Sequence, residues 1–311
     1  MADAPHPSVG RTGAYGLLAF VVVSQGANWP VMAVALETFS PLWVTALRFV
    51  VAFVAFVVVL AVGSQLRLPA RADAPIVLST ALVRLLAVHA LTFLGLGHVP
   101  PGRSSILVYS AALWTVPIAS VVLGEKPDRL RSLGLAVGIT GILFLIEPWT
   151  FDWSDRDVVV GHALLLTASF LLAGFTVHVR GHRFRSSPLV LMPWECALGA
   201  LTAAALALWI EGPLDVEWSP GAVANVAYQG AIATGLGIWA VVVMSRAIPA
   251  ISSNIGQMGI PCVGLLSSVL VLSERVTVAV VAGLLLIMVG VALGAVSDWS
   301  PEGVLASAAR D

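Results

Sequence analysis

Long apolar stretches separated by short polar connections run along almost the whole 311-residue chain. A bilayer core about 30 Å thick is crossed by a helix of roughly 17–25 apolar residues. Several stretches have this length, and none alternates polar and apolar residues at the two-residue period of a membrane β-barrel. The pattern predicts ten helical spans, at residues 13–36, 41–62, 76–97, 104–123, 130–147, 160–179, 188–210, 221–245, 252–272 and 277–296.

Composition supports a membrane protein. Hydrophobic residues make up 59% of the chain and charged residues 11%, whereas a soluble domain carries about 45–50% apolar and about 25% charged residues. A net charge of −1 provides no broad basic surface for nucleic acid. Both cysteines, Cys196 and Cys262, lie inside apolar stretches, so we expect neither a disulfide nor a thiolate metal site. We therefore predict an all-α integral membrane protein without a metal or cofactor.

The positions of the lysines and arginines predict the orientation of the spans. With the amino terminus in the cytoplasm, eleven of the sixteen bases fall on the cytoplasmic side, three fall outside, and Arg48 and Arg84 fall within spans. The first dozen residues lack the basic end and apolar core of a cleaved signal peptide. Ten spans then leave both termini in the cytoplasm.

The two halves of the chain repeat the same landmarks at a constant separation. Three residues recur 149 positions later (274 − 125, 283 − 134, 290 − 141). They are Glu125, Gly134 and Gly141 in the first half, and Glu274, Gly283 and Gly290 in the second. This period divides ten spans into five and five, and an odd number forces the second half to cross the membrane in the opposite sense. We predict inverted repeats at 13–147 and 160–296, an external linker at 148–159, and cytoplasmic tails at 1–12 and 297–311.

The repeated glycines indicate close helix packing. Gly134 and Gly138, like Gly290 and Gly294, are four residues apart and place bare backbone on one helix face. In lipid such faces let helices approach closely. We expect spans five and ten to form a scaffold, while Glu125 and Glu274 mark helix ends at opposite membrane faces.

With these features the sequence resembles the EamA-type transporters of the drug/metabolite transporter superfamily. The motif PLWVTALRF opens span two at residues 41–49, and Pro261 precedes Glu274 by thirteen residues (274 − 261). The resemblance implies a bacterial inner-membrane permease that exports amino acids or other small metabolites. The family that it resembles includes a branch with tryptophan in span four that exports aromatic amino acids. Two departures are Ala112, thirteen residues before Glu125, and Glu195, which takes the place of Arg48 in the second half.

Charged residues within spans are expected to face a cavity or a partner, because each costs about 2.5–3.5 kcal/mol on insertion scales. Arg84 lies about 12 Å deep in span three at 1.5 Å per residue. It is either a clamp for a substrate carboxylate, or a helix cross-link or snorkelling side chain. Arg48 and Glu195 enter from opposite faces to a similar depth. They are predicted to pair, either as a structural contact or as a gate that breaks during transport.

Polar and aromatic side chains at mid-span are the remaining candidates for a substrate pocket. Rings and amides together suit an amphipathic zwitterion with an apolar side chain, although some of the rings are expected simply to fill gaps between helices. These candidates are Gln25, Asn28, Trp29, His89, Tyr109, Ser110, Trp114, Tyr228, Gln229, Trp239, Asn254 and Gln257. Three prolines interrupt spans and are candidate hinges: Pro30, Pro117 and Pro261.

The residues and the family resemblance together predict a secondary transporter that works by alternating access between the two repeats. We expect it to export amino acids, aromatic or large hydrophobic ones in particular, or related small metabolites, across the inner membrane. No phosphate-binding motif of the GxxxxGK[ST] kind is present. Two alternatives stay open: a flippase or carrier for lipid-linked or nucleotide-linked substrates, and a membrane enzyme. The six histidines are scattered, without an HExxH motif, which disfavours the enzyme. The sequence leaves monomer and homodimer open.

Overall fold

The computed structural model describes residues 10–124, 127–150, 155–244, 247–248, 253 and 256–297. Over these residues the backbone forms helices and their connections, without a strand, so the expected all-helical class is confirmed there. The predicted landmark Glu125 and the candidate site residue Asn254 lie outside the described residues. In chain order the helices are α1 (Arg11–Ala35), α2 (Pro41–Val62), η1 (Arg71–Asp73), α3 (Ala74–Ser79), η2 (Thr80–Ala87), α4 (Val88–Leu96), α5 (Pro101–Tyr109), α6 (Ala111–Leu123), α7 (Arg129–Ile146), η3 (Pro148–Thr150), α8 (Arg156–Arg180), α9 (Pro188–Ile210), α10 (Pro220–Ala227), η4 (Tyr228–Leu236), α11 (Gly237–Met244), α13 (Gly259–Leu272) and α14 (Val278–Ser297).

Eight helical runs are long and apolar enough to cross a bilayer, and they coincide with the first eight predicted spans. Three of these runs are built from consecutive pieces, because the helix changes its hydrogen-bonding pattern or turns within the span. The two remaining apolar helices are shorter, at Gly259–Leu272 and Val278–Gly294. The total of ten spans therefore stays a prediction.

Proline marks the first turn of several helices. Pro41, Pro101, Pro188 and Pro220 each open a helix, as the first residue of α2, α5, α9 and α10. The first N–H groups of a helix have no partner within it, so the missing N–H of proline costs nothing there. The same residue type that interrupts a span elsewhere thus defines where these spans begin.

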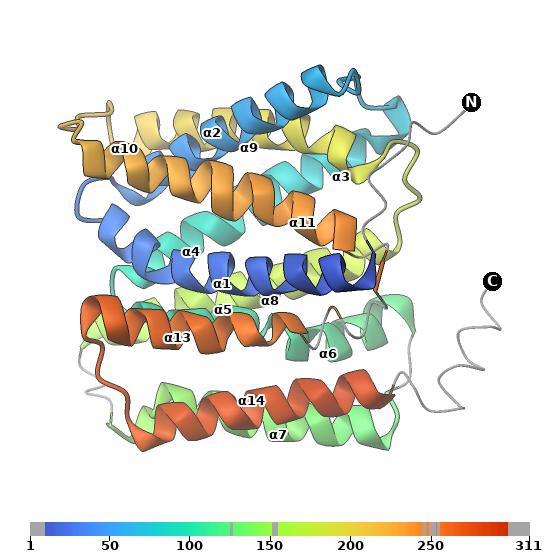
Figure 1. Ribbon diagram of the computed structural model, residues 1–311. Helices are drawn as coiled ribbons and strands as arrows, with labels where there is room; N and C mark the ends of the chain where they lie inside the picture. Colours follow the sequence, from blue (N-terminus) through green and yellow to red (C-terminus); the bar gives the residue numbers. More distant parts are fainter. Residues whose placement is uncertain are drawn as a thin grey trace.

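The long helices lie side by side, and two repeat-related pairs pack against each other (Figure 1). These pairs are α2 with α9 and α7 with α14, whereas α1 packs along α13, which is not its repeat counterpart. The α7 and α14 pair lies at one side of the bundle, and the α2 and α9 pair lies at the other. α1 begins and α14 ends at the same end of the bundle, which we call the α1-start end. The opposite end is the α1-finish end.

Glycine brings the backbones of α7 and α14 into contact. A methyl group added at Gly141 would lie 2.8 Å from the Gly283 carbonyl oxygen, and one added at Gly283 would lie 2.8 Å from the Gly141 oxygen. Gly134 and Gly290 meet in the same reciprocal way at 2.5 Å. The glycine packing expected of spans five and ten is present, but an added methyl at Gly294 would meet nothing within 4 Å. The contact joins repeat-related positions crosswise, as a local two-fold axis requires.

We expect Gly141→Ala to lower stability by about 1–3 kcal/mol, because the added methyl forces apart two backbones that cannot yield like a flexible side chain. Gly174→Ala is the matched control, since a methyl there has no neighbour within 4 Å and alanine favours the helix. Thermal unfolding of the purified protein in detergent measures both. Equal melting temperatures for the two variants would contradict this account of the α7 and α14 contact.

Candidate functional site

Two repeat-related spans contain a wider, π-helical segment. η2 lies in the third span and η4 in the eighth, and their first residues are 148 positions apart (228 − 80). In the wider turns, some backbone carbonyl groups form hydrogen bonds with the side chain five residues later. His89 Nδ1 lies 2.9 Å from the Arg84 oxygen, and Thr234 Oγ1 donates to the Gln229 oxygen at 2.8 Å. Such segments are frequent at functional sites, and both carry residues of the cavity described below.

The fourth span turns at Ser110, and a turn at Met258 comes just before α13, again 148 positions apart (258 − 110). The residues just before these turns, Tyr109 and Gln257, line the cavity. Ser110 itself is fully buried; its hydroxyl donates to the Leu107 oxygen at 2.6 Å and lies 3.1 Å from Ser169 Oγ on α8. Ser110 thus joins two helices and does not face the cavity.

The three candidate hinge prolines do not coincide with these irregularities. α1 continues through Pro30, and α6 continues through Pro117. Pro261 lies in the first turn of α13, where its missing N–H is tolerated. The bending predicted at prolines remains a prediction, and the turns at Ser110 and Met258 are better placed for it because they adjoin the cavity.

A cavity of about 500 Å³ lies between the two halves of the chain. Trp29 and Met32 of α1 and Phe49 of α2 form part of its apolar wall, and Phe175 of α8 and Ile238 of α11 form another part. The cavity reaches the α1-start end near Val179, Phe184 and Pro188. At the other end it stops at the buried core, which includes Phe39, Val44, Leu96 and Ile106. A site of this size fits a small metabolite.

Nine of the predicted residues line the cavity: Gln25, Asn28, Trp29, Arg48, Arg84, His89, Tyr109, Glu195 and Gln257. Trp29 and Tyr109 meet edge to face at 6.3 Å between ring centroids, and Phe49 meets His89 in the same way at 5.1 Å. Gln25 Nε2 donates to the Ala233 oxygen at 2.9 Å, which ties α1 to η4. The wall is thus a mixture of rings and amides held by contacts between helices.

Four further candidates lie away from this cavity. The Tyr228 hydroxyl donates to the Ser24 oxygen at 2.9 Å, which joins η4 to α1, and Gln229 donates to Asn225 one turn earlier in the same span at 2.6 Å. Trp114 packs edge to face against Phe170 at 6.3 Å. Trp239 packs against the cluster of Val21, Ala240 and Ile260. These side chains fill space between helices, which was the alternative interpretation of the rings in the sequence.

Arg48 is buried and held in place on the cavity wall. Its Nε donates to Thr234 Oγ1 at 2.8 Å, and its Nη1 lies 3.7 Å from Met32 Sδ. Gly230 makes this possible, because a methyl there would lie 2.7 Å from the Arg48 carbonyl oxygen. The absence of a side chain lets η4 approach α2 closely enough for Thr234 to reach the guanidinium.

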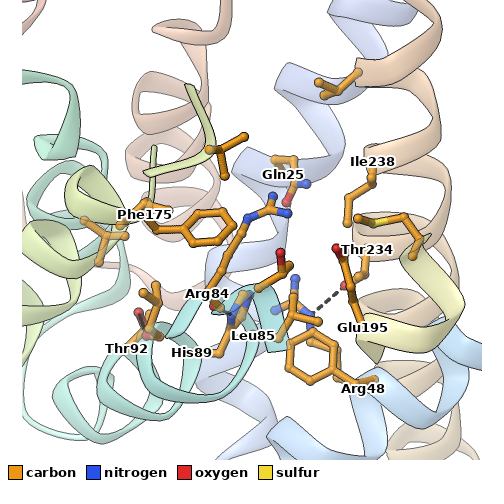
Figure 2. A pocket seen from close by; sticks show the side chains of 18 of the residues that line it. Gln25, Arg48, Arg84, Leu85, His89, Thr92, Phe175, Glu195, Thr234 and Ile238 are labelled. Carbon is orange, nitrogen blue, oxygen red and sulfur yellow. Dashed lines mark hydrogen bonds between the residues drawn. The ribbon is translucent and has the colours of Figure 1, made fainter. Parts of the chain in front are cut away.

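Arg48 and Glu195 do not form the ion pair that their depths predicted. Arg48 is bonded to Thr234, while Glu195 Oε2 is buried without a hydrogen-bond partner. The cation that acts on the Glu195 carboxylate is Arg84. Figure 2 shows the guanidinium of Arg84 reaching from η2 toward Gln25, with Glu195 on the other wall beside Thr234. No salt bridge joins Arg84 and Glu195, both of which belong to the described chain.

Several cavity residues were missed by the sequence analysis. Thr234 holds Arg48, Thr80 and Thr92 add hydroxyls, and Phe175 and Phe184 add rings. Threonine and phenylalanine are common in apolar spans, so their type alone gave no signal. The Thr234 hydroxyl bonds the carbonyl of Gln229, five residues earlier, in the π-helical turn. The hydrophobic periodicity of the sequence does not reveal such a turn.

Carboxylates close the α1-finish end of the bundle. Glu211, just after α9, accepts hydrogen bonds from the Leu42 and Trp43 N–H groups at 2.9 and 3.2 Å and from Ser40 Oγ at 2.6 Å. Glu274, just after α13, accepts from the Gly102 and Arg103 N–H groups at 2.8 and 3.3 Å. Each carboxylate satisfies the open N–H groups at a helix start and complements its dipole.

Glu274 is the carboxylate whose ionisation is most affected at this end. Burial raises its pKa above the ordinary value, and the hydrogen bonds from Gly102 and Arg103 and the charge of Arg103 partly oppose this rise. Arg103 also forms an ion pair with Glu147 at 2.8 Å, and Thr277 donates to the same carboxylate at 3.1 Å. The α5 start, the α13 end and the α7 end are therefore joined in one polar network.

At the α1-start end a carboxylate also accepts backbone hydrogen bonds, but the cavity is open at this end. Asp73 of η1 accepts hydrogen bonds from the Arg185 and Ser186 N–H groups at 3.0 and 2.7 Å, in the connection just before α9. This carboxylate ties the start of the third span to the segment that leads into α9. Among the described residues no group of three His, Cys, Asp or Glu side chains is placed to hold a metal ion.

Comparison with known proteins agrees with this architecture. The sequence matches the EamA-like transporter family twice, over residues 12–147 and 159–295. An uncharacterized transporter of Bacillus subtilis (strain 168), YvbV, is 24% identical over 279 residues, covering 89% of this chain and 90% of its own. A probable amino-acid metabolite efflux pump of Escherichia coli (strain K12) is 28% identical over 290 residues, covering 88% and 92%.

A protein of known crystal structure shares the fold, with a TM-score of 0.66 and 18% identity over 93% of this chain and 98% of that one. Both repeats seen in the sequence thus match the same family, and the helical bundle is that of a multi-pass membrane protein. The chain belongs to the EamA-like transporter family, and so to the drug/metabolite transporter superfamily.

Proposed function

We propose that this protein exports amino acids, with a preference for aromatic or other large hydrophobic side chains, across the bacterial inner membrane by alternating access. The observation that carries the proposal is the cavity between the repeats. It combines apolar and aromatic walls with one carboxylate and two guanidinium groups. An amino acid brings an ammonium group, a carboxylate and an apolar side chain to such walls. The E. coli relative named as an amino-acid metabolite efflux pump supports the same class.

The open end of the cavity supports uptake of substrate from the cytoplasm. Both the start of α1 and the end of α14 lie at the end that the cavity reaches, and the distribution of bases favours the cytoplasm for this end. With both termini cytoplasmic, the structure corresponds to an inward-facing state. The Glu211 and Glu274 contacts then form the closed external gate, and export requires the Glu274 contact to open.

The alternatives from the sequence are less favoured by this cavity. A lipid-linked or nucleotide-linked substrate carries phosphate, which favours several unpaired bases. Here Arg48 is already bonded to Thr234, and Glu195 repels an anion. A membrane enzyme is disfavoured by the family match, since the relatives described above are named transporters or efflux pumps.

The first experiment measures counterflow in liposomes containing the full chain, with phenylalanine, leucine and threonine against nucleosides and sugars. We expect amino-acid flux, fastest for phenylalanine. Phe175→Ala should lower the preference for phenylalanine over threonine about tenfold, because one apolar contact is worth about 1–3 kcal/mol. Phe170→Ala, an exposed ring on the same helix, is the control and should not change the preference. Flux no higher than in empty liposomes would overturn the proposed function.

The external gate generates a second prediction. Glu274→Ala removes the acceptor for two backbone N–H groups at the start of α5, and charge-assisted hydrogen bonds contribute about 1.5–3 kcal/mol each. The reporter is Val108→Cys on the cavity wall, in a protein that also carries Cys196→Ala and Cys262→Ala. We expect Glu274→Ala to make this reporter react about tenfold or more faster with an impermeant thiol reagent added outside than it does with Glu274 present. Glu217→Ala, exposed at the same end, is the control, and unchanged labelling in Glu274→Ala would exclude this residue from the gate.

The same labelling reports a pH dependence. The pKa of Glu274 is raised in the closed state by burial, whereas opening exposes the carboxylate to water. The closed state therefore binds the proton more tightly, and protonation favours it. As the external pH falls toward the ordinary glutamate value of about 4.3, we expect labelling at position 108 to slow more than the loss of thiolate alone requires. In Glu274→Ala only the loss of thiolate should remain, and an equal slowing in both proteins would contradict the assigned role of Glu274.

A further inference from the structure

Two opposite charges line the cavity without forming a bond to each other. Glu195 is 2% exposed, and its Oε2 atom has no hydrogen-bond partner. The side chain of Arg84 makes no hydrogen bond or ion pair with any residue of the described chain. Both line the same cavity, from opposite walls. The Thr80 hydroxyl is a hydrogen-bond partner of the Glu195 carboxylate, but Oε2 remains unsatisfied. A buried carboxylate with an unsatisfied oxygen and no cation in contact is unfavourable for folding alone, so its presence needs another explanation.

A structural ion pair does not explain this arrangement. Buried ion pairs are tolerated when the two groups touch and their remaining hydrogen bonds are satisfied. Arg84 acts on the Glu195 carboxylate through space, yet the two groups are not in contact. Arg48, the other guanidinium nearby, is already bonded to Thr234 and Met32 and does not neutralise Glu195. The gap between Arg84 and Glu195 is therefore a feature of the cavity.

We propose that Glu195 and Arg84 together recognise the two charges of a zwitterionic amino acid: Glu195 binds the ammonium group and Arg84 binds the carboxylate. This inference rests on the proposed transport function and names the residues that select its substrate. An ammonium group donates hydrogen bonds to a carboxylate, and a guanidinium donates two parallel hydrogen bonds to a carboxylate. Asn28 also lines the cavity, and its Oδ1 is a second buried acceptor without a partner that is available to the ammonium group.

The arrangement predicts discrimination by charge. An amine without a carboxylate leaves Arg84 unpaired, and an acid without an ammonium group leaves Glu195 unpaired. Sites that hydrogen-bond a polar group reject analogues that lack it, because their own buried groups then lose a partner. The side chain contributes through Phe175, which lies next to Arg84 in Figure 2, and through Trp29. Charge thus selects the class of substrate, and the rings select among its members.

The test compares the binding of L-phenylalanine, 2-phenylethylamine and 3-phenylpropionate to the full-length protein in detergent, by the concentration dependence of thermal stabilisation. The wild type should bind phenylalanine at least about tenfold more tightly than either analogue. Glu195→Gln should weaken phenylalanine binding about 10- to 100-fold while 3-phenylpropionate binds equally well or better. Arg84→Gln should give the mirror result with 2-phenylethylamine. Glu217→Gln and Arg183→Gln, both exposed and outside the cavity, should change nothing.

Two results would overturn the inference. One is a wild type that binds a singly charged analogue as tightly as phenylalanine, and the other is an equal loss of all three ligands in both cavity variants. The melting temperature without ligand supplies an independent measurement. Glu195→Gln should melt no lower than the wild type, because it removes an unpaired buried charge, whereas a clear fall would assign Glu195 a structural role instead.

Flux separates this inference from the proposed function. Selective binding of phenylalanine without counterflow in liposomes would overturn the transport proposal and leave the charge recognition standing. Counterflow of phenylalanine together with unselective binding would do the reverse. Both failing together would overturn both.

Discussion

The hydrocarbon layer contains no water to bond a free N–H or C=O group, so irregular backbone is tolerated only where protein or a cavity surrounds it. This constraint connects the fold to the site. The wider turns of η2 and η4 and the turns at Ser110 and Met258 all lie around or beside the cavity. Freed carbonyls at Arg84 and Gln229 are bonded by His89 and Thr234. The cavity thus exists at the level where the helices depart from regular geometry.

The rest of the bundle is regular and reciprocal. Glycine lets α7 and α14 touch along their backbones, and van der Waals contact of this kind holds helices together in lipid, where the hydrophobic effect does not. Carboxylates at the helix ends add a second type of contact. Glu211 ties the end of α9 to the start of α2, and Asp73 of η1 ties the third span to the connection before α9. In the proposed transport cycle, the Glu274 contact between α13 and α5 is the joint that opening must break.

Sequence patterns predicted the spans and the repeats, which depend on length and spacing. They did not predict side-chain contacts, which depend on how each helix is rotated about its axis. Apolar length located eight spans, and a constant offset identified the repeats. Depth placed Arg48 and Glu195 at one level, but depth says nothing of the direction in which each side chain points, and Arg48 is bonded to Thr234 instead. Trp114 and Trp239 were candidates by type alone; their rings pack between helices because their faces of the helix turn away from the cavity.

The contrast between a symmetric scaffold and an asymmetric site fits the zwitterionic substrate proposed above. For alternating access, inverted repeats need matching helix ends and matching irregular turns, because each half must be able to take the position of the other. A zwitterion has no such symmetry, since one end is a cation and the other an anion. Arg48 and Glu195 occupy equivalent places, each seven residues after the proline that opens α2 or α9 (48 − 41 and 195 − 188), and carry opposite charges. Under the proposed recognition, a duplicated scaffold suits such a solute where its two copies differ, and the departure at Glu195 is one of those places.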